Sequence, residues 1–286
     1  MEVLMMDMKL VKELRERTGA GILECKKALE ITNDNMDEAI KYLESHLKHE
    51  SKNQRVASKG STRVVTHLDE AILFEVNAET DFAAKNPFFL ELMDQLSNIF
   101  ISNPIKNVKE ALSFIIGEKK VEDHIEYVSG QMKEHIYLRR FHRIKKQPSQ
   151  GFGTYIHGQG KLSILVILDK PNESLEKQLA MAIAASSPTY ISIKRLDTDT
   201  LNYEKFLFEK DPQGFKSFDD FLSRKMLLNL PSISNPNQTI GQLLDEANLN
   251  VIDFYRFELG QGIEDKLNCR LDVPCDGSTI TVTPVY

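Results

Sequence analysis

The order of helical and β-rich segments constrains the fold of this chain more than any other sequence feature. Strand-like runs come as neighbours, at residues 64–68 with 71–77 and within 153–168, and helical stretches separate these neighbours. Runs joined by short turns predict antiparallel hairpins, whereas regular strand–helix alternation would predict a parallel sheet. The sequence therefore predicts an α+β fold with antiparallel sheets.

Helical periodicity is clear in the first 48 residues, where three apolar stripes recur at spacings of three and four. Gly19 and Gly21 separate the first two stripes, because glycine permits the backbone angles of a tight connection. The second stripe contains Ile22 and Cys25. Three helices of this size bury little surface, so residues 1–50 are predicted to form a small separate module.

The rest of the chain divides into five predicted parts. Residues 51–63 are expected to be a basic linker, because they carry almost no large apolar side chains. Helices are expected between residues 87 and 129 and at 173–186 and 239–247, and strands at 133–146 and 251–259. The resulting parts are a core subdomain at 64–149, a second one at 150–196 and 236–275, an inserted pair of short helices at 197–235, and a tail at 276–286.

Composition excludes several classes of protein. The 286 residues are 41% hydrophobic and 27% charged, as in ordinary globular proteins. A net charge of -6 argues against broad nucleic-acid binding, which needs a basic surface. Three cysteines suit a reducing compartment. Since no apolar run approaches ~20 residues and the first residues lack a leader composition, we expect no membrane span and a cytoplasmic location.

An acid and a large aromatic ring stand side by side at a polar turn, as Asp81 and Phe82. Asp81 offers a charge and a hydrogen-bond acceptor, and Phe82 offers a hydrophobic wedge. The ring is either folded back into the core of its own domain or kept for a partner, and its position in the sequence does not decide between the two. A wedge of this kind indicates a protein that acts on another protein.

The other candidate sites give weaker signals. The glycine-rich segment 151–161 lacks the spacing of a phosphate loop, and a hairpin with glycine turns explains it. Cys269 and Cys275 have no histidine near them, so we expect two reduced cysteines and no zinc site. No catalytic nucleophile arrangement is legible. We therefore expect neither enzyme chemistry nor a cofactor.

Two further features each leave two interpretations open. The basic strand at 139–146 mixes cations with an aromatic residue, which could bind RNA or the ribosome. It could equally be the solvated face of an edge strand. Ile22 and Leu23 are adjacent on a predicted helix and cannot both face one small core. One of them is either an exposed partner contact or an ordinary exposed apolar residue.

Two motifs resemble the elongation factor Ts family. They are LVKELRERTGAGILECKKAL at residues 10–29 and ETDFAAKN at 79–86, in which Ala83 stands where valine is usual. Shorter matches follow in family order: YIHG at 155–158, AIAASSPTYI at 182–191, TIGQLL at 239–244 and RFELGQGIED at 256–265. The resemblance covers residues 8–265.

The resemblance implies a protein that binds elongation factor Tu in its GDP-bound form and speeds release of the nucleotide, passing through a nucleotide-free complex. It also implies a UBA-like N-terminal bundle, a core of two α+β subdomains and a helical hairpin that is shortened here. We expect no direct nucleic-acid contact, and the sequence leaves a homodimer open. By position, the implied partner contacts are Arg15, Ile22, Leu23 and Lys26 in the bundle, Thr80, Asp81 and Phe82 at the wedge, and Met132, His157 and Ile233. Met132 and Lys133 depart from a pair that is commonly Ile-Gly.

Overall fold

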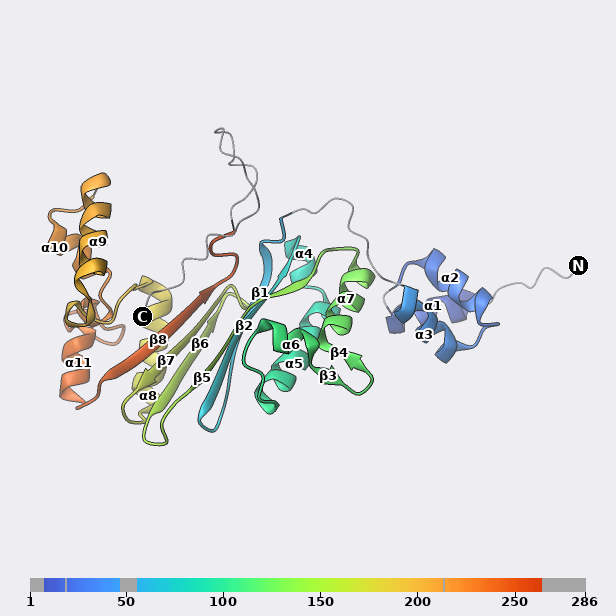
Figure 1. Cartoon of the computed structure of the whole chain (residues 1–286), viewed down its shortest axis with the longest axis horizontal. Coiled ribbons are helices and arrows are strands. Elements are labelled where there is room, and N and C mark those ends of the chain that lie inside the picture. The colour runs from blue at the N-terminus through green and yellow to red at the C-terminus, as the bar shows by residue number, and fades with distance from the viewer. Residues whose placement is uncertain (1–7, 19, 47–55, 213, 264–286) are drawn as a thin grey trace, which may run out of the picture. The chain divides into compact units, whose positions relative to one another are not determined.

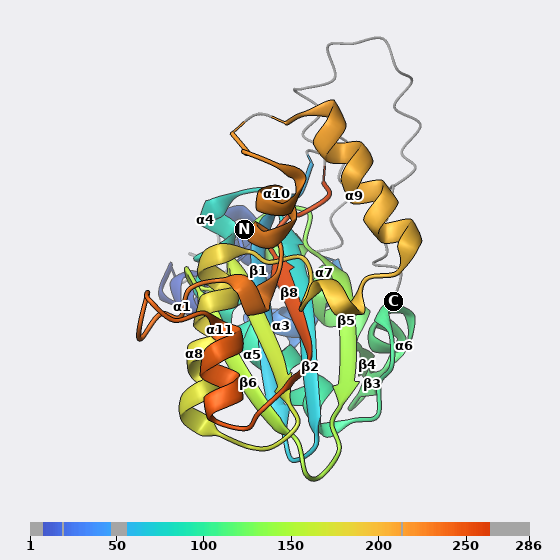
Figure 2. The same cartoon turned by 90° about the vertical axis from the view of Figure 1, so that its left-hand side faces the viewer.

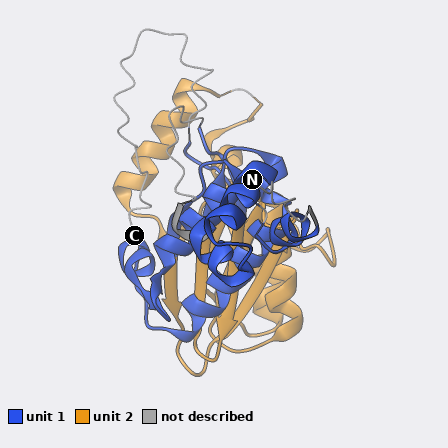
Figure 3. Ribbon diagram, turned by 90° about the vertical axis from the view of Figure 1, so that its right-hand side faces the viewer, with its two compact units in different colours: residues 1–61, 75–141, 259–286 blue, residues 62–74, 142–258 orange. Residues whose placement is uncertain are grey.

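The computed structural model describes residues 8–18, 20–46, 56–212 and 214–263 (Figure 1). The chain divides into two compact units, each built from segments distant in sequence (Figure 3). Unit 1 comprises 1–61, 75–141 and 259–286, and unit 2 comprises 62–74 and 142–258. The predicted α+β class, with antiparallel sheets and an N-terminal helical bundle, is confirmed.

The bundle consists of α1 (Met8–Thr18), α2 (Ile22–Ile31) and α3 (Met36–His46), as the periodicity predicts. The Gly21 N–H that opens α2 donates to the Glu24 carboxylate at 2.8 Å. Asn35 caps α3, because its side-chain oxygen accepts from the Glu38 N–H at 3.2 Å. The three helices share one apolar core that includes Val11, Leu14, Cys25, Ala28, Leu29, Ala39 and Leu43.

A three-stranded sheet has the order β1-β2-β5, from β1 (Lys59–His67), β2 (Glu70–Ala78) and β5 (Tyr137–Lys145). The start of β1 corrects the predicted linker, because residues 59–63 belong to this strand. Gly60, Ser61 and Thr62 of this segment are buried, whereas Lys59 is exposed. The Thr62 hydroxyl, for example, donates to the Gly160 carbonyl at 2.9 Å and is buried. Hydrogen bonds to distant residues allow a polar sequence to be buried in a sheet.

Unit 1 also contains α4 (Asp81–Ala84), α5 (Pro87–Ser102), α6 (Val108–Ser113) and α7 (Val121–Met132). The helices predicted between 87 and 129 are therefore present. Two strands of two residues, β3 (Ile115–Ile116) and β4 (Lys119–Lys120), separate α6 from α7 and were not predicted. The ring of Phe100 in α5 meets Phe141 of β5 edge-on, with centroids 5.1 Å apart. The apolar face of α5 buries Phe89, Leu92, Met93, Leu96 and Phe100.

In unit 2, β6 (Gly151–His157), β7 (Leu162–Leu168) and β8 (Val251–Glu258) form an antiparallel sheet in the order β6-β7-β8. Every residue of β7 is buried, because both of its faces are covered. Ile164 and Val166 pack in the cluster that α8 (Glu173–Ser186) and α11 (Ile240–Glu246) complete. Figure 2 shows these two helices beside the sheet. On the other face, Leu165 and Ile167 pack with Val64, Leu73 and Ile144.

The segment predicted to hold two short helices forms α9 (Thr198–Lys210) and α10 (Phe218–Arg224), flanked by the 3₁₀ turns η1 (Ile193–Arg195) and η2 (Leu227–Asn229). Its one buried carboxylate among the described residues, Glu204, accepts from the Tyr190 hydroxyl at 2.8 Å and pairs with the Lys225 ammonium. Burial, together with the Glu204 hydrogen bond, raises the pKa of Tyr190.

Two predictions fall outside the described residues: the tail at 276–286, and the reduced state of Cys269 and Cys275. Within the described part of the chain, no helix has the length and apolar character that a membrane crossing requires.

Candidate protein-binding site

Phe82 stands in the first turn of α4 with 87% of its side chain exposed. The turn itself is well defined, since the Thr80 hydroxyl caps α4 by accepting from the Ala83 N–H at 3.1 Å. Ala83 points inward and is buried. The interpretation that Phe82 folds into the core of its own domain is therefore wrong. The chain holds a large apolar ring in solvent on an ordered turn, which is typical of a contact for another surface.

The Phe82 turn is tied to the segment that follows α7 by two glutamates. The Glu134 carboxylate accepts two hydrogen bonds from Thr80, one from its N–H at 3.0 Å and one from its hydroxyl at 2.6 Å. In the opposite direction, the Glu79 carboxylate accepts from the His135 N–H at 3.2 Å. We call these three hydrogen bonds the crossed glutamate contacts. The predicted contact Met132 therefore lies two residues before Glu134, which binds the turn that carries Phe82.

The segment after α7 is itself ordered by the protein. Lys133 ends the helix with a left-handed backbone, at φ 56° and ψ 34°. The Ser129 hydroxyl donates to the Glu134 carbonyl and accepts from the Ile136 N–H at 3.3 Å. Glu134 therefore approaches Thr80 from a fixed backbone.

The bundle presents a second exposed apolar pair, at the start of α2. Ile22 is 47% exposed and Leu23 is 81% exposed. Both residues are therefore exposed, and Cys25, Ala28 and Leu29 fill the inward face of this helix. Of the other predicted contacts here, Arg15 is exposed and Lys26 is half-buried. Burial raises the pKa of the Cys25 thiol, which suits a core residue and not a nucleophile.

Two predicted contacts belong to unit 2, and both are exposed. His157 ends β6, and its Nδ1 lies 3.2 Å from the Tyr155 hydroxyl. Ile233 lies in the connection between η2 and α11. Both side chains are therefore accessible to a partner.

The glycine-rich segment 151–161 forms the β6–β7 hairpin and no phosphate cradle. Gly153 has a packing reason: a Cβ at this position would lie 2.3 Å from the Glu176 carbonyl oxygen of α8. Only glycine lets the helix approach the strand this closely.

Four of the five lysines and arginines in the basic strand, Arg139, Arg140, Arg143 and Lys145, are paired with carboxylates of β2 and of the turn before it. In unit 1, Arg139 and Arg140 both bind the fully buried Glu75. In unit 2, Arg143 pairs with Glu70 and Lys145 with Asp69. These pairs offset much of the positive charge that an RNA site would need, which disfavours the RNA interpretation.

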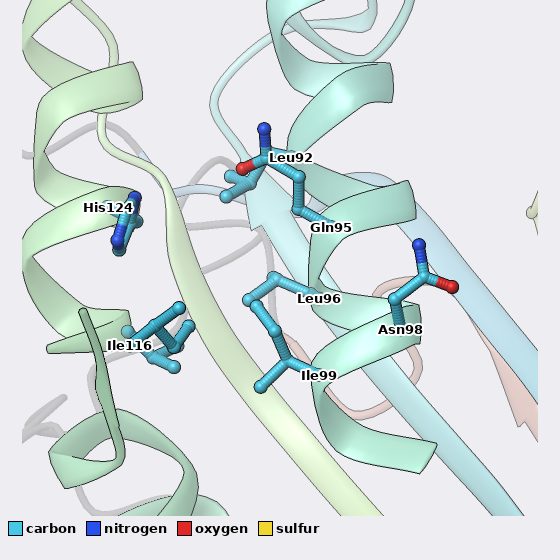
Figure 4. Close-up of a pocket in the computed structure, with 8 residues that line it drawn as sticks. Leu92, Gln95, Leu96, Asn98, Ile99, Ile116 and His124 are labelled. Carbon is cyan, nitrogen blue, oxygen red and sulfur yellow. The ribbon is translucent and has the colours of Figure 1, made fainter. Parts of the chain in front are cut away.

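A pocket of about 380 Å³ lies between α5 and α7 in unit 1. Ile116 and His124 face Leu96 and Ile99 across it (Figure 4). Its walls are almost wholly apolar and offer no cluster of donors for a phosphate. The pocket therefore gives no support for a nucleotide site on this chain.

Glu134 and Glu79 are the site residues that the sequence did not single out. Their only local signal is that Glu79 opens the ETDFAAKN motif and Glu134 follows the predicted contact Met132. Glu134 and Thr80 are 54 positions apart, so only the tertiary structure brings them together.

Comparison with known proteins gives consistent matches. The family model described as Elongation factor TS matches residues 79–261. A protein named Elongation factor Ts from Acholeplasma laidlawii (strain PG-8A) is 37% identical over 278 residues, covering 91% of this chain and 94% of the relative. Its namesakes from Spiroplasma citri and Oenococcus oeni (strain ATCC BAA-331 / PSU-1) are 37% and 34% identical. The match to the Spiroplasma citri protein covers 90% of this chain and 93% of that relative. The match to the Oenococcus oeni protein covers 89% of this chain and 92% of that relative.

Proposed function

Because this chain belongs to the elongation factor Ts family of translation elongation factors, we propose that it is a guanine nucleotide exchange factor for elongation factor Tu. In this proposal it binds the GDP-bound partner in the cytoplasm, speeds GDP release and forms a nucleotide-free complex, with no covalent chemistry of its own. The observation that carries the proposal is the Phe82 ring, which is 87% exposed on an anchored turn.

The proposed mechanism is mechanical. A GTPase holds GDP through backbone groups of a phosphate loop and through Mg²⁺, whose charge offsets the phosphates. Phe82 inserts between elements of the partner's GTPase domain, and Asp81 forms a hydrogen bond beside it. Displacing those elements disturbs the Mg²⁺ site and weakens the hold on the phosphates.

The free energy needed to weaken nucleotide binding is larger than the burial of Phe82 alone can supply. Burying one Phe contributes ~1.5–3 kcal/mol, whereas a thousandfold loss of nucleotide affinity costs about 4 kcal/mol. The difference is assigned to wider docking, through Arg15, Ile22, Leu23 and Lys26 of the bundle and through His157 and Ile233 of unit 2. The exposure of Leu23, His157 and Ile233 supports this assignment. Linkage makes the effect reciprocal, so GDP weakens binding of this protein by the same factor.

The test is the Phe82→Ala variant, with release of a fluorescent GDP analogue from elongation factor Tu followed by stopped flow. We expect release to slow about tenfold, the lower bound for losing one buried Phe. Leu68→Ala is the matched control, since it removes an apolar side chain that is 81% exposed from the β1–β2 turn. A release rate for Phe82→Ala equal to that of Leu68→Ala contradicts the wedge.

A further inference from the structure

We infer that Glu134 is a positioning residue for the wedge, and that it acts on Phe82 through Thr80. The inference rests on the proposed function, because it names a residue outside the wedge on which nucleotide release depends. It also has a part that is independent of any partner, since it makes a claim about the isolated chain. That claim is that the Glu134 carboxylate sets the conformation of the turn carrying Phe82.

The first step is the short length of α4. A helix of four residues has too few internal hydrogen bonds to offset the cost of its own nucleation. Its conformation must therefore be imposed by its neighbours. The contacts that reach it from outside this segment include the two hydrogen bonds between Thr80 and Glu134.

The second step is the hydrogen-bond polarity at Thr80. A hydroxyl has one proton to donate and two lone pairs to accept with. The Thr80 hydroxyl gives its proton to Glu134 at 2.6 Å and accepts from the Ala83 N–H at 3.1 Å. Donation to Glu134 thus directs the hydroxyl so that its lone pairs remain for the helix. The carboxylate orients the cap, and the cap holds the turn on which Phe82 stands.

The third step is the chemistry of the side chain at 134. Both groups that Thr80 presents to it, the N–H and the hydroxyl, are donors. An ionised carboxylate is acceptor-only and satisfies both at once. A glutamine of the same size has only one acceptor oxygen, so it cannot accept from both Thr80 groups, and one Thr80 proton loses its acceptor. Glu134→Gln therefore removes one of the two contacts without creating a cavity.

The fourth step is that exposure makes this anchoring necessary. Phe82 has almost no contact with its own domain to hold it, because 87% of its side chain is exposed. An aromatic ring that must enter a partner loses less conformational entropy on binding if its backbone is already ordered. The crossed glutamate contacts provide that order in the free protein.

The experiment compares Glu134→Gln with Glu126→Gln, a control on the exposed face of α7. In the isolated full-length chain, hydrogen exchange of the Ala83 amide is measured by NMR. We expect it to rise about tenfold in Glu134→Gln, the effect of losing one charged hydrogen bond. We expect no change in Glu126→Gln. If the Ala83 amide of Glu134→Gln exchanges at the wild-type rate, the inference is overturned, whatever effect the variant has on GDP release.

Nucleotide release then separates positioning from general stability. We expect Glu134→Gln to slow GDP release from elongation factor Tu, and Glu134→Asp, which keeps an acceptor-only group, to recover part of the rate. Residues that act as one unit are non-additive. With the double variant Phe82→Ala/Glu134→Gln, GDP should therefore leave elongation factor Tu at the same rate as with Phe82→Ala alone. Fully additive reductions in the release rate would show that Glu134 acts elsewhere. If the wild-type chain does not speed GDP release from elongation factor Tu, the proposed function fails. The hydrogen-exchange result for the Ala83 amide still decides the inference.

Discussion

Lys133 ends α7 in the left-handed region of the backbone, at φ 56°. A side chain with a Cβ is strained there by about 1 kcal/mol, and glycine is not. The family resemblance places glycine at this position, and the backbone explains why. The Lys133 ammonium lies 3.1 Å from the Glu24 carboxylate, but both side chains are partly exposed, and such pairs contribute ~0–1 kcal/mol.

We therefore expect Lys133→Gly to leave the protein equally stable or to stabilise it by up to about 1 kcal/mol. The measurement is urea unfolding followed by circular dichroism. Lys133→Ala is the control, because it removes the same ammonium but keeps the strained Cβ. The explanation is wrong if the glycine variant is no more stable than the alanine variant.

At the scale of the element, α9 begins with a titratable cap. Asp197 accepts from the Thr200 N–H at 2.6 Å. This backbone hydrogen bond, joined by one from the Thr200 side chain, holds the pKa of Asp197 below its ordinary value. The unfolded chain therefore binds the proton at a higher pH than the folded chain does. The stabilisation from the ionised cap is complete above the unfolded pKa of roughly 3.9 and is lost as the pH falls through the lower folded pKa.

Asp197→Asn keeps a side-chain acceptor and removes the titration. We expect the wild type to be more stable than Asp197→Asn near pH 6, because a negative charge is favourable at a helix start. The difference should vanish below the folded pKa, which a carbon NMR titration of the carboxyl group locates. Glu209→Gln removes an exposed carboxylate from the last turn of α9 instead and should show no such loss. A difference that grows on acidification would reverse the assigned sign.

Element prediction succeeded where a segment carries its own signal. The helix predicted at 173–186 is α8, with the bounds that the periodicity indicates, and the helix predicted at 239–247 is α11, which Thr239 caps. It failed where a segment depends on its neighbours. The two-residue strands β3 and β4 are too short for any period, and β1 buries the polar residues Ser61 and Thr62.

At the scale of the whole molecule, the bundle has an apolar core of its own, from Val11 to Leu43. We therefore expect a chain without residues 1–50 to remain folded and to bind elongation factor Tu at least tenfold more weakly, since the exposed Ile22 and Leu23 would no longer contribute apolar burial. Calorimetric titration measures the affinity. The full-length Leu23→Ala variant should lose part of the same affinity. Full affinity in the shortened chain would remove the bundle from the proposed interface.

The candidate site was predicted in part. The motif placed Asp81 and Phe82 together, because neighbours in sequence remain neighbours in space. The pattern of residues left the ring either buried or exposed, since that outcome depends on which surfaces surround the turn. In the same way, the sequence left an RNA interpretation open for the basic strand 139–146. Glu75, which pairs with Arg139 and Arg140, lies 64 and 65 positions before them, so no local pattern shows the pairing.

The sequence by itself determined the α+β class, the three-helix bundle, most of the longer elements and the elongation factor Ts resemblance. These depend on local periodicity, turn chemistry and contiguous motifs, which a linear chain displays in full. Only the tertiary structure decided that Phe82 is exposed, that Glu134 holds Thr80 and that Glu75 pairs with two arginines. Each of these outcomes depends on which distant segments the packed core brings together, and no local pattern encodes that choice.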